Sequence, residues 1–391
     1  MSASAACGFA AMLKTVKIKN FRSFRQFELH DLGRINLLVG ANNSGKTSVL
    51  EAIHLLRAQG NPRAFIDLMK SRGEYMSGES KSNREWNIRH LFHGHSFDVG
   101  SEFSVTGATQ KSKHLEHLTV SVSTHDPIRH TFREDLSRRL EIENEDRLGL
   151  FEAYDLKVDW SFGKEHNSWG NLVSLQGGLS SPTPAMPPRP VRASQASPSN
   201  NLKVEFLTCA GLSVAQVVKW FDQIVLTPEE ENVYEALRTI EPNIKRIATI
   251  NNNKISEGIS AQKGFAVLID DYRVPIGSMG DGIWRMLGLV LASIQVSNGC
   301  LLVDEIDTGL HFTAMTDMWK LIWEIAKRLN VQVFATTHSS DCWKSLAAVA
   351  RKYDTSDDGI TIQRIERNQS KGVVFSGEET FLASDMGIEV R

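Results

Sequence analysis

A glycine-rich loop near the start of the chain has the spacing of a phosphate-binding site. Residues 40–47 read Gly-Ala-Asn-Asn-Ser-Gly-Lys-Thr and fit the pattern G-x-x-x-x-G-K-[ST]. Glycines let the backbone wrap closely around phosphates, and the N–H groups at a helix start attract the anion. In this pattern Lys46 reaches the outer phosphates and Thr47 ligates Mg²⁺. The predicted ATP-binding residues are Gly40, Ala41, Asn42, Asn43, Ser44, Gly45, Lys46, Thr47 and Ser48.

Two carboxylates follow a short apolar run and supply chemistry that the loop lacks. Residues 300–303 read Cys-Leu-Leu-Val, which is typical of a buried strand, and Asp304 and Glu305 come directly after it. The carboxyl ends of parallel strands meet at the ligand edge of a sheet. Asp304 is therefore predicted to reach the Mg²⁺ shell, and Glu305 to orient or deprotonate the attacking water. The alternative is a strand that ends in a solvated acidic turn.

A histidine follows a third candidate strand. Val331–Ala335 is mainly apolar, and Thr336, Thr337 and His338 come next, so His338 is expected at the same edge of the sheet. At neutral pH an imidazole can donate to a phosphate oxygen or position a water molecule. A structural histidine is the alternative.

A second glycine-rich segment lies at residues 275–282 and reads Pro-Ile-Gly-Ser-Met-Gly-Asp-Gly. A helix over Ile283–Ile294 is predicted to follow, and the free N–H groups at its start attract anions. Because the loop at 40–47 already holds phosphates, Ser278 and Gly280 are predicted to approach the γ-phosphate from a second copy of the chain. A tight turn before a packed helix is the alternative.

The elements around these motifs predict an α/β fold. Ile35–Val39 is an apolar strand that leads into the loop, and Val49, Leu50, Ile53 and Leu56 then have helical spacing. A helix is predicted from Thr227, as N-cap, to Ile240. The final third alternates strands and helices. Its predicted elements are Phe265–Ile269, Ile283–Ile294, Cys300–Val303, Met318–Leu329 and Val331–Ala335.

The middle of the chain has the pattern of an antiparallel β lobe. Short β-rich stretches occur at Glu102–Thr106, Leu118–Ser123, Leu156–Phe162 and Leu202–Leu207. Residues 177–201 contain six prolines among small and polar residues, which predicts a flexible insertion. Three histidines at 90, 93 and 95 lack the cysteine partners of a zinc site, so a partly exposed loop is favoured there.

Bulk composition excludes several classes of protein. Lys plus Arg number 44 against 46 Asp plus Glu, so no general attraction to nucleic acid or anionic lipid is expected. Four widely spaced cysteines indicate a reducing cytoplasm and not a disulfide scaffold. Residues 1–11 predict a disordered leader that lacks the pattern of a signal peptide. No apolar run is long enough for a membrane span.

The order of these motifs resembles the heads of ABC-type ATPases. Within that class the chain is similar to stand-alone AAA-type, OLD-like ATPases related to SMC and recombination-repair proteins. The similar stretches are Leu13–Phe24 (LKTVKIKNFRSF), Ile35–Ala52 (INLLVGANNSGKTSVLEA) and Asp304–His311 (DEIDTGLH). They cover roughly residues 12–57 and 226–340, and the insertion between them is matched only in outline.

The resemblance implies an α/β head, with an antiparallel β lobe and a mixed β and helical insertion between the Walker A loop and the signature loop. Its implied parts are a leader at 1–11, an N-terminal head segment at 12–60, the insertion at 61–225 and the C-terminal head segment at 226–391. The roles it implies are phosphate and metal binding for Lys46 and Thr47, Walker B for Asp304, catalytic base for Glu305, trans signature for Ser278 and Gly280, subunit-contacting loop for Asp307, switch histidine for His338, and nucleotide-flanking positions for Arg22 and Ser23.

Three departures from the family pattern matter. The signature reads Ser-Met-Gly-Asp-Gly in place of Leu-Ser-Gly-Gly-Gln, so the contact with a second copy is expected to be tuned differently. Gln59 lies nearest the first helix, but no glutamine is assigned as the metal-contacting residue. Only 53 residues follow His338, which is too short for the Toprim nuclease domain of OLD-type proteins.

Two functions follow from these expectations. The leading hypothesis is a slow ATPase that dimerises around nucleotide and regulates a separate effector, a nuclease or toxin, in anti-phage defence. The alternative is a DNA-binding repair or genome-maintenance ATPase, for which Arg138, Arg139 and the Pro-Arg-Pro-Val-Arg run at 188–192 are modest basic features. A transporter subunit is disfavoured because of the atypical signature.

Overall fold

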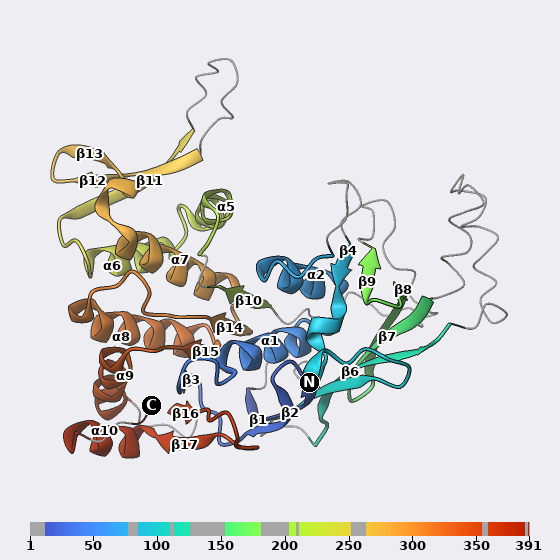
Figure 1. Cartoon of the computed structure of the whole chain (residues 1–391). Helices are drawn as coiled ribbons and strands as arrows, with labels where there is room; N and C mark the ends of the chain where they lie inside the picture. The colour runs from blue at the N-terminus through green and yellow to red at the C-terminus, as the bar shows by residue number, and fades with distance from the viewer. Residues whose placement is uncertain are drawn as a thin grey trace, which may run out of the picture. The chain divides into compact units, whose positions relative to one another are not determined.

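The chain forms two compact units in a computed structural model (Figure 1). The structure describes residues 12–76, 85–109, 113–125, 153–180, 203–208, 211–251, 263–353, 359–387 and 390. Unit 1 comprises Met1–Lys14, Leu29–Leu50 and Asn200–Arg391, and unit 2 comprises Thr15–Glu28 and Glu51–Ser199. The leader, most of the proline-rich insertion, Arg138 and Arg139 lie outside the described residues. The domain boundaries expected from the sequence stay a prediction.

Unit 1 contains a six-stranded, mostly parallel sheet. The strands lie in the order β10-β14-β15-β3-β16-β17, and all neighbours are parallel except β16 and β17. The central strands β3, β14 and β15 are buried at every position, which explains why most of their residues are apolar. Their bounds are β10 Val204–Leu207, β14 Cys300–Val303, β15 Gln332–Thr336, β3 Ile35–Val39, β16 Ile360–Arg364 and β17 Val373–Ser376.

The helices of unit 1 pack against one another and share a core with this sheet. The pairs α5 and α7, α6 and α7, α7 and α8, α8 and α9, and α9 and α10 all pack together (Figure 1). Their apolar stripes join the central strands in one core that includes Trp319 and Trp343. The bounds are α5 Val214–Ile224, α6 Glu230–Arg238, α7 Asp281–Gln295, α8 Phe312–Arg328, α9 Ser340–Tyr353 and α10 Gly377–Asp385.

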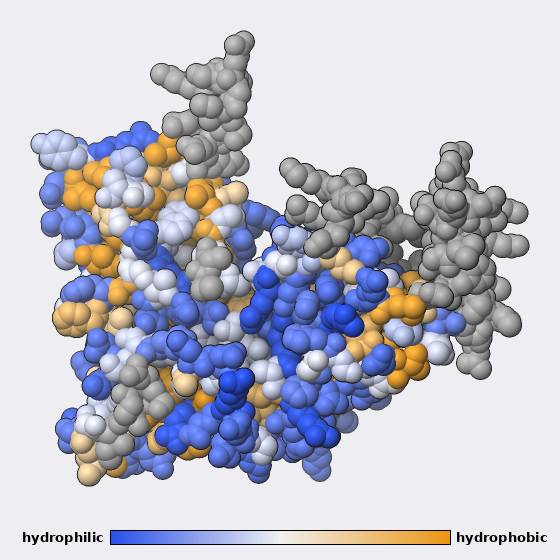
Figure 2. All heavy atoms as spheres, viewed as in Figure 1, coloured by the Kyte–Doolittle hydropathy of each residue, from blue (hydrophilic) through white to orange (hydrophobic). Residues whose placement is uncertain are grey.

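A small antiparallel sheet in unit 1 corrects one expectation. Phe265–Ile269 is a strand, as predicted, but it belongs to β12 (Lys263–Ile269), which pairs with β11 (Ile244–Asn251) and β13 (Tyr272–Pro275). It therefore lies outside the parallel sheet. A short apolar run is compatible with a parallel or an antiparallel sheet, so the sequence of this strand does not reveal which sheet it joins. On the face shown in Figure 2, apolar residues gather over this small sheet.

Two further predictions differ from the structure. Leu202–Leu207 was expected in the antiparallel lobe, yet β10 pairs in parallel with β14 at the edge of the six-stranded sheet. Four residues are too few to reveal their partner. The helix expected from Thr227 begins at Glu230, because the Thr227 hydroxyl donates to Ile224 O (2.6 Å) instead of capping the helix.

The predicted antiparallel lobe is present in unit 2. An eight-stranded sheet has the order β2-β1-β5-β6-β7-β8-β9-β4, and β5 to β8 form a continuous antiparallel ladder. The alternating burial of β5 and β6 matches a sheet with one covered face. The bounds are β1 Leu13–Phe21, β2 Phe24–Leu29, β4 Glu85–Asn87, β5 Glu102–Thr109, β6 Glu116–Thr124, β7 Ala153–Phe162, β8 Glu165–Ser174 and β9 Gly178–Ser180.

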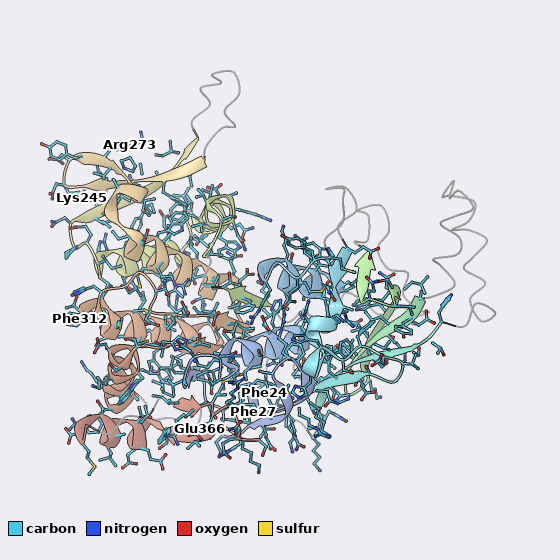
Figure 3. All side chains as sticks on the ribbon, viewed as in Figure 1. Phe24, Phe27, Lys245, Arg273, Phe312 and Glu366 are labelled. Atoms are coloured by element: carbon cyan, nitrogen blue, oxygen red, sulfur yellow. The ribbon has the colours of Figure 1, made fainter. Side chains whose placement is uncertain are left out.

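Local contacts support single elements of unit 2. On β2, the rings of Phe24 and Phe27 stack with centroids 4.6 Å apart (Figure 3). Helix α2 (Pro62–Ser71) starts at an Asn61 cap, whose side chain accepts from Arg63 N.

Among the described residues, no helix is both long enough and apolar enough to cross a membrane.

A buried ion pair anchors the end of α1 (Lys46–Arg57) to β6. Arg57 Nη1 lies 2.8 Å from Glu116 Oε2, and Trp160 Nε1 donates to Glu116 Oε1 at 3.2 Å. Burial raises the pKa of Glu116, and the Arg57 charge opposes that shift. Removal of one partner would leave the other charge buried without compensation.

We expect Arg57→Met to destabilise unit 2 by about 3–5 kcal/mol, because Glu116 loses its buried counter-charge. Denaturant and thermal unfolding of the full chain measure the loss. The matched control is Arg63→Met, whose side chain is 86% exposed, with an effect within about 0.5 kcal/mol. The double variant Arg57→Met/Glu116→Gln should recover part of the loss. Equal stability of Arg57→Met and Arg63→Met would contradict the role of the ion pair.

Candidate functional site

The loop between β3 and α1 has a backbone that requires glycine. Gly40 has φ 142°, and a Cβ atom there would lie 2.3 Å from Ile365 O. Gly45 has φ 101°, and α1 begins at the next residue, Lys46. The predicted arrangement of buried strand, glycine loop and helix is therefore present, and the N-terminus of α1 adjoins the loop.

The loop holds its lysine in a partly desolvated position. Lys46 Nζ donates to Gly40 O and Ala41 O, at 2.8 Å each. Burial lowers the pKa of Lys46 to about 8, although the charges of Asp304 and Glu305 act in the opposite direction. Ser44 Oγ is buried and, among the described residues, has no hydrogen-bond partner. An ammonium group, a spare hydroxyl and a helix N-terminus together fit a phosphate.

Thr47 and Asp304 join the start of α1 to the end of β14. Thr47 Oγ1 donates to Asp304 at 3.0 Å from Oδ1 and 3.2 Å from Oδ2. Thr336 Oγ1, at the end of β15, donates to the same Oδ1 at 2.7 Å. The two side chains that the sequence predicts near Mg²⁺, Thr47 and Asp304, are therefore hydrogen-bonded to each other.

These donors fit Mg²⁺ in its usual protein setting. Mg²⁺ binds one or two protein oxygens and completes its shell with substrate phosphates and water. The Thr47 hydroxyl and the Asp304 carboxylate are such a pair. The described part of the chain holds no cluster of three or more His, Cys, Asp or Glu residues suited to a metal, His90, His93 and His95 included.

Glu305 has a constrained backbone. Its φ of 48° lies in the left-handed region, which costs a non-glycine residue roughly 1–3 kcal/mol. Glu305 N donates to Thr336 Oγ1 at 2.8 Å, and Arg285 Nη2 on α7 donates to the carbonyls of Asp304 (2.9 Å) and Glu305 (2.8 Å). The surrounding contacts therefore fix the conformation from which the Glu305 carboxylate projects.

His338 shares the electrostatic environment of this cluster. It follows β15 by two residues. Partial burial and the Lys46 charge lower the pKa of His338, while Glu305, Asp307 and Asp304 act in the opposite direction. The lowered pKa favours a neutral imidazole at pH 7, which can still donate one N–H. The neighbouring Thr337 hydroxyl donates to Asp307 Oδ1 at 2.7 Å and so fixes the loop that follows Glu305.

Ser278 and Gly280 lie on an exposed turn. The 3₁₀ helix Ile276–Met279 precedes Gly280, which has φ 91°, and α7 then starts without a side-chain cap. Ser278 Oγ donates locally, to Pro275 O at 2.7 Å, and not to the loop at 40–47. The structure thus places the signature residues at a helix N-terminus but does not join them to the phosphate loop within one chain.

Arg22 lies among carboxylates in unit 2. It forms ion pairs with Glu51 and with Glu74, the latter at 2.5 Å, while its neighbour Ser23 is exposed. Arg72 adds a second ion pair to Glu51 at 2.6 Å. The nucleotide contacts expected of Arg22 and Ser23 stay a prediction. Gln59, the nearest candidate for a metal-contacting glutamine, is buried after α1.

Sequence reasoning missed two residues that hold the carboxylates. In the sequence, Thr336 is one of three polar residues that follow a predicted strand, and a hydroxyl at the end of a buried strand is the signal that points to it. Arg285 falls within the helix predicted over Ile283–Ile294 and has no local motif. Only the packing of α7 against the end of β14 brings it to Asp304 and Glu305.

Residues 35–341 match the family described as "AAA domain, putative AbiEii toxin, Type IV TA system". The chain belongs to this family. The matched range includes the strand, glycine loop and helix at 35–57 and most of the parallel sheet of unit 1.

Named relatives are similar at several levels. An "ATP/GTP phosphatase" of Helicobacter pylori (strain ATCC 700392 / 26695) is 23% identical over 94% of this chain and 99% of its own. The "DNA replication and repair protein RecF" of Nitrosococcus oceani is 59% identical, but over 10% of this chain and 11% of its own. A solved Smc head domain bound to the C-terminal domain of ScpA, derived from Pyrococcus furiosus, is 12% identical with a TM-score of 0.46, covering 96% of this chain and 98% of that one.

We expect Thr336→Val to lower kcat for ATP hydrolysis roughly tenfold to a hundredfold, because displaced catalytic groups carry losses of that order. Valine keeps the shape but leaves Glu305 N without its acceptor and removes one of the two hydroxyl groups that donate to Asp304. Steady-state phosphate release measures the effect. Thr313→Val, at an exposed position early in α8, is the control. Equal kcat values for the two variants would show that Thr336 does not support the carboxylates.

Proposed function

We propose that the chain binds and hydrolyses ATP at the loop 40–48 and acts as a nucleotide-switched homodimer. The observation that carries the proposal is the contact of Thr47 with Asp304, beside Lys46 and Glu305, within one unit. A structural glycine turn would not need a lysine, a metal-binding hydroxyl and two carboxylates in one place.

Each residue of the cluster has a chemical task. Lys46 and the N–H groups of the loop neutralise and orient the phosphates. Thr47 and Asp304 would hold Mg²⁺, and the ion would supply positive charge that offsets the negative charge of the phosphates. Glu305 accepts a proton from the attacking water, and His338 donates its N–H toward the γ-phosphate. Arg22 and Ser23 would flank the nucleotide only after Arg22 leaves its carboxylate partners.

The exposed turn at Ser278 supports a composite site. Gly280 leaves the first N–H groups of α7 without a side-chain cap, which makes this helix start attractive to an anion. Within its own chain, Ser278 bonds to Pro275 O and not to the phosphate loop. We therefore infer that the turn contacts the γ-phosphate of ATP bound to a second copy of the chain. ATP would then join two heads, and hydrolysis would release them.

A separate effector is the finer part of the proposal. The family description mentions a toxin and a toxin–antitoxin system, which supports a role beside a nuclease or toxin in anti-phage defence. In that arrangement the ATPase cycle times the effector. A nuclease or toxin gene next to this reading frame would support the role, and a repair gene would favour the second candidate below.

Glu305→Gln is expected to bind ATP with near wild-type affinity but to lose at least a hundredfold in kcat, because the amide cannot accept the proton. The trapped nucleotide should shift the chain from monomer to dimer. Light scattering with and without Mg-ATP, together with single-turnover hydrolysis, measures both effects. Glu324→Gln on α8, an acidic residue with the same chemical change, is the control. Rapid turnover by Glu305→Gln would remove Glu305 from the role of base.

A second candidate is direct binding of duplex DNA, favoured by the short but high-identity match to RecF. If this chain grips DNA, log Kd should rise with log salt at about 0.9 per neutralised phosphate, which gives a slope of roughly 4 or more for several contacts. Fluorescence anisotropy with a blunt duplex between low and moderate NaCl, with and without ATP, measures the slope. A flat slope or no binding at low salt contradicts this candidate.

A further inference from the structure

Arg285 connects a helix to the backbone of the catalytic carboxylates. Its Nη2 donates to two successive carbonyls, Asp304 O at 2.9 Å and Glu305 O at 2.8 Å. Both bonds are partly buried, and a guanidinium group makes stronger hydrogen bonds than a neutral donor. Arg285 touches the backbone and not the reacting atoms, so any effect on chemistry must pass through Glu305.

The backbone that Arg285 holds is strained at Glu305. Glu305 has φ 48°, whereas the L-amino acids prefer negative φ. Two anchors oppose relaxation. Thr336 Oγ1 accepts from Glu305 N on the β15 side, and Arg285 donates to the carbonyl on the α7 side. Loss of either anchor frees the peptide to rotate toward a more favourable φ and takes the carboxylate with it.

Helix α7 contacts the same segment a second time, near its own start. A Cβ on Gly282 would lie 2.9 Å from Gly309 O, and a Cβ on Gly309, which has φ 79°, would lie 3.2 Å from Asp281 Cβ. The helix therefore rests on the segment 304–309 at two points. Its apolar side is buried in the core of unit 1, which makes it a rigid support.

We propose that Arg285 is a positioning residue for Glu305, and that it holds the base in the left-handed conformation from which it meets the attacking water. Through α7, the same contact links the backbone of Glu305 to the Ser278–Gly280 turn. A ligand that shifts this turn would shift the base of its own chain. The inference rests on the proposed hydrolysis at Glu305 and deepens it.

The test compares Arg285→Met with Arg285→Lys in the full chain. Methionine keeps much of the packing but removes both donors, whereas lysine keeps a charged donor. We expect Arg285→Met to lose at least tenfold in kcat with KM and the affinity for a fluorescent ATP analogue changed less than threefold. Arg285→Lys should recover part of kcat. The control Arg273→Met alters an exposed arginine on β13 (Figure 3) and should match the wild type.

The double variant Arg285→Met/Glu305→Gln separates positioning from other roles. If Arg285 acts through Glu305, the double variant is no slower than Glu305→Gln alone, because the losses are not additive. Multiplying losses would overturn the inference, as would wild-type kcat in Arg285→Met. A parallel loss of nucleotide affinity in both the methionine and lysine variants would indicate a structural role and would also overturn it.

Failure of the inference is distinct from failure of the proposed function. If the wild type does not hydrolyse ATP, or if Glu305→Gln turns over rapidly, the proposed function fails. If both behave as expected and Arg285→Met still turns over at the wild-type rate, only the positioning role fails. Should Arg285→Met not fold, the kcat of Arg285→Lys decides, because a value equal to the wild type with unchanged KM contradicts dependence on the guanidinium geometry.

Discussion

The carboxylate of Asp304 is the point on which the rest of unit 1 depends. It accepts from Thr47 on the first helix and from Thr336 on the neighbouring strand, and so it ties together the ends of three elements. A buried carboxylate is tolerated only with such partners. The parallel strands β3, β15 and β14 bring these groups to one edge, and because the strands are buried at every position, that edge lies at the end of a buried core.

Features could be predicted from the sequence where the local backbone or the ligand requires one particular type of residue. Gly40 and Gly45 have backbone angles that other residues resist, and Lys46 and Thr47 follow at a spacing set by a helix start. The neighbouring strands were equally clear because burial on both faces leaves short runs of mainly apolar residues. For these reasons the α/β fold, the β lobe and the phosphate loop could all be predicted.

The rest depended on packing that no local pattern records. Leu202–Leu207 is an alternating stretch in either kind of sheet, and only its partner β14 assigns it to the parallel one. The sequence around Arg285 carries no signal of its role, which depends on its hydrogen bonds to the carbonyls of Asp304 and Glu305 in the folded chain. The roles of Ser278, Arg22 and Ser23 require nucleotide or a second chain, and no property of a single side chain reveals them.

The left-handed backbone of Glu305 also bears on how such a site can change over evolutionary time. The residue occupies a conformation that glycine adopts without strain, yet glycine has no carboxylate. Selection for a more stable fold and selection for turnover therefore pull position 305 in opposite directions. An inactive descendant that keeps only nucleotide binding would have no reason to retain glutamate there, and the cost of its backbone would favour its replacement.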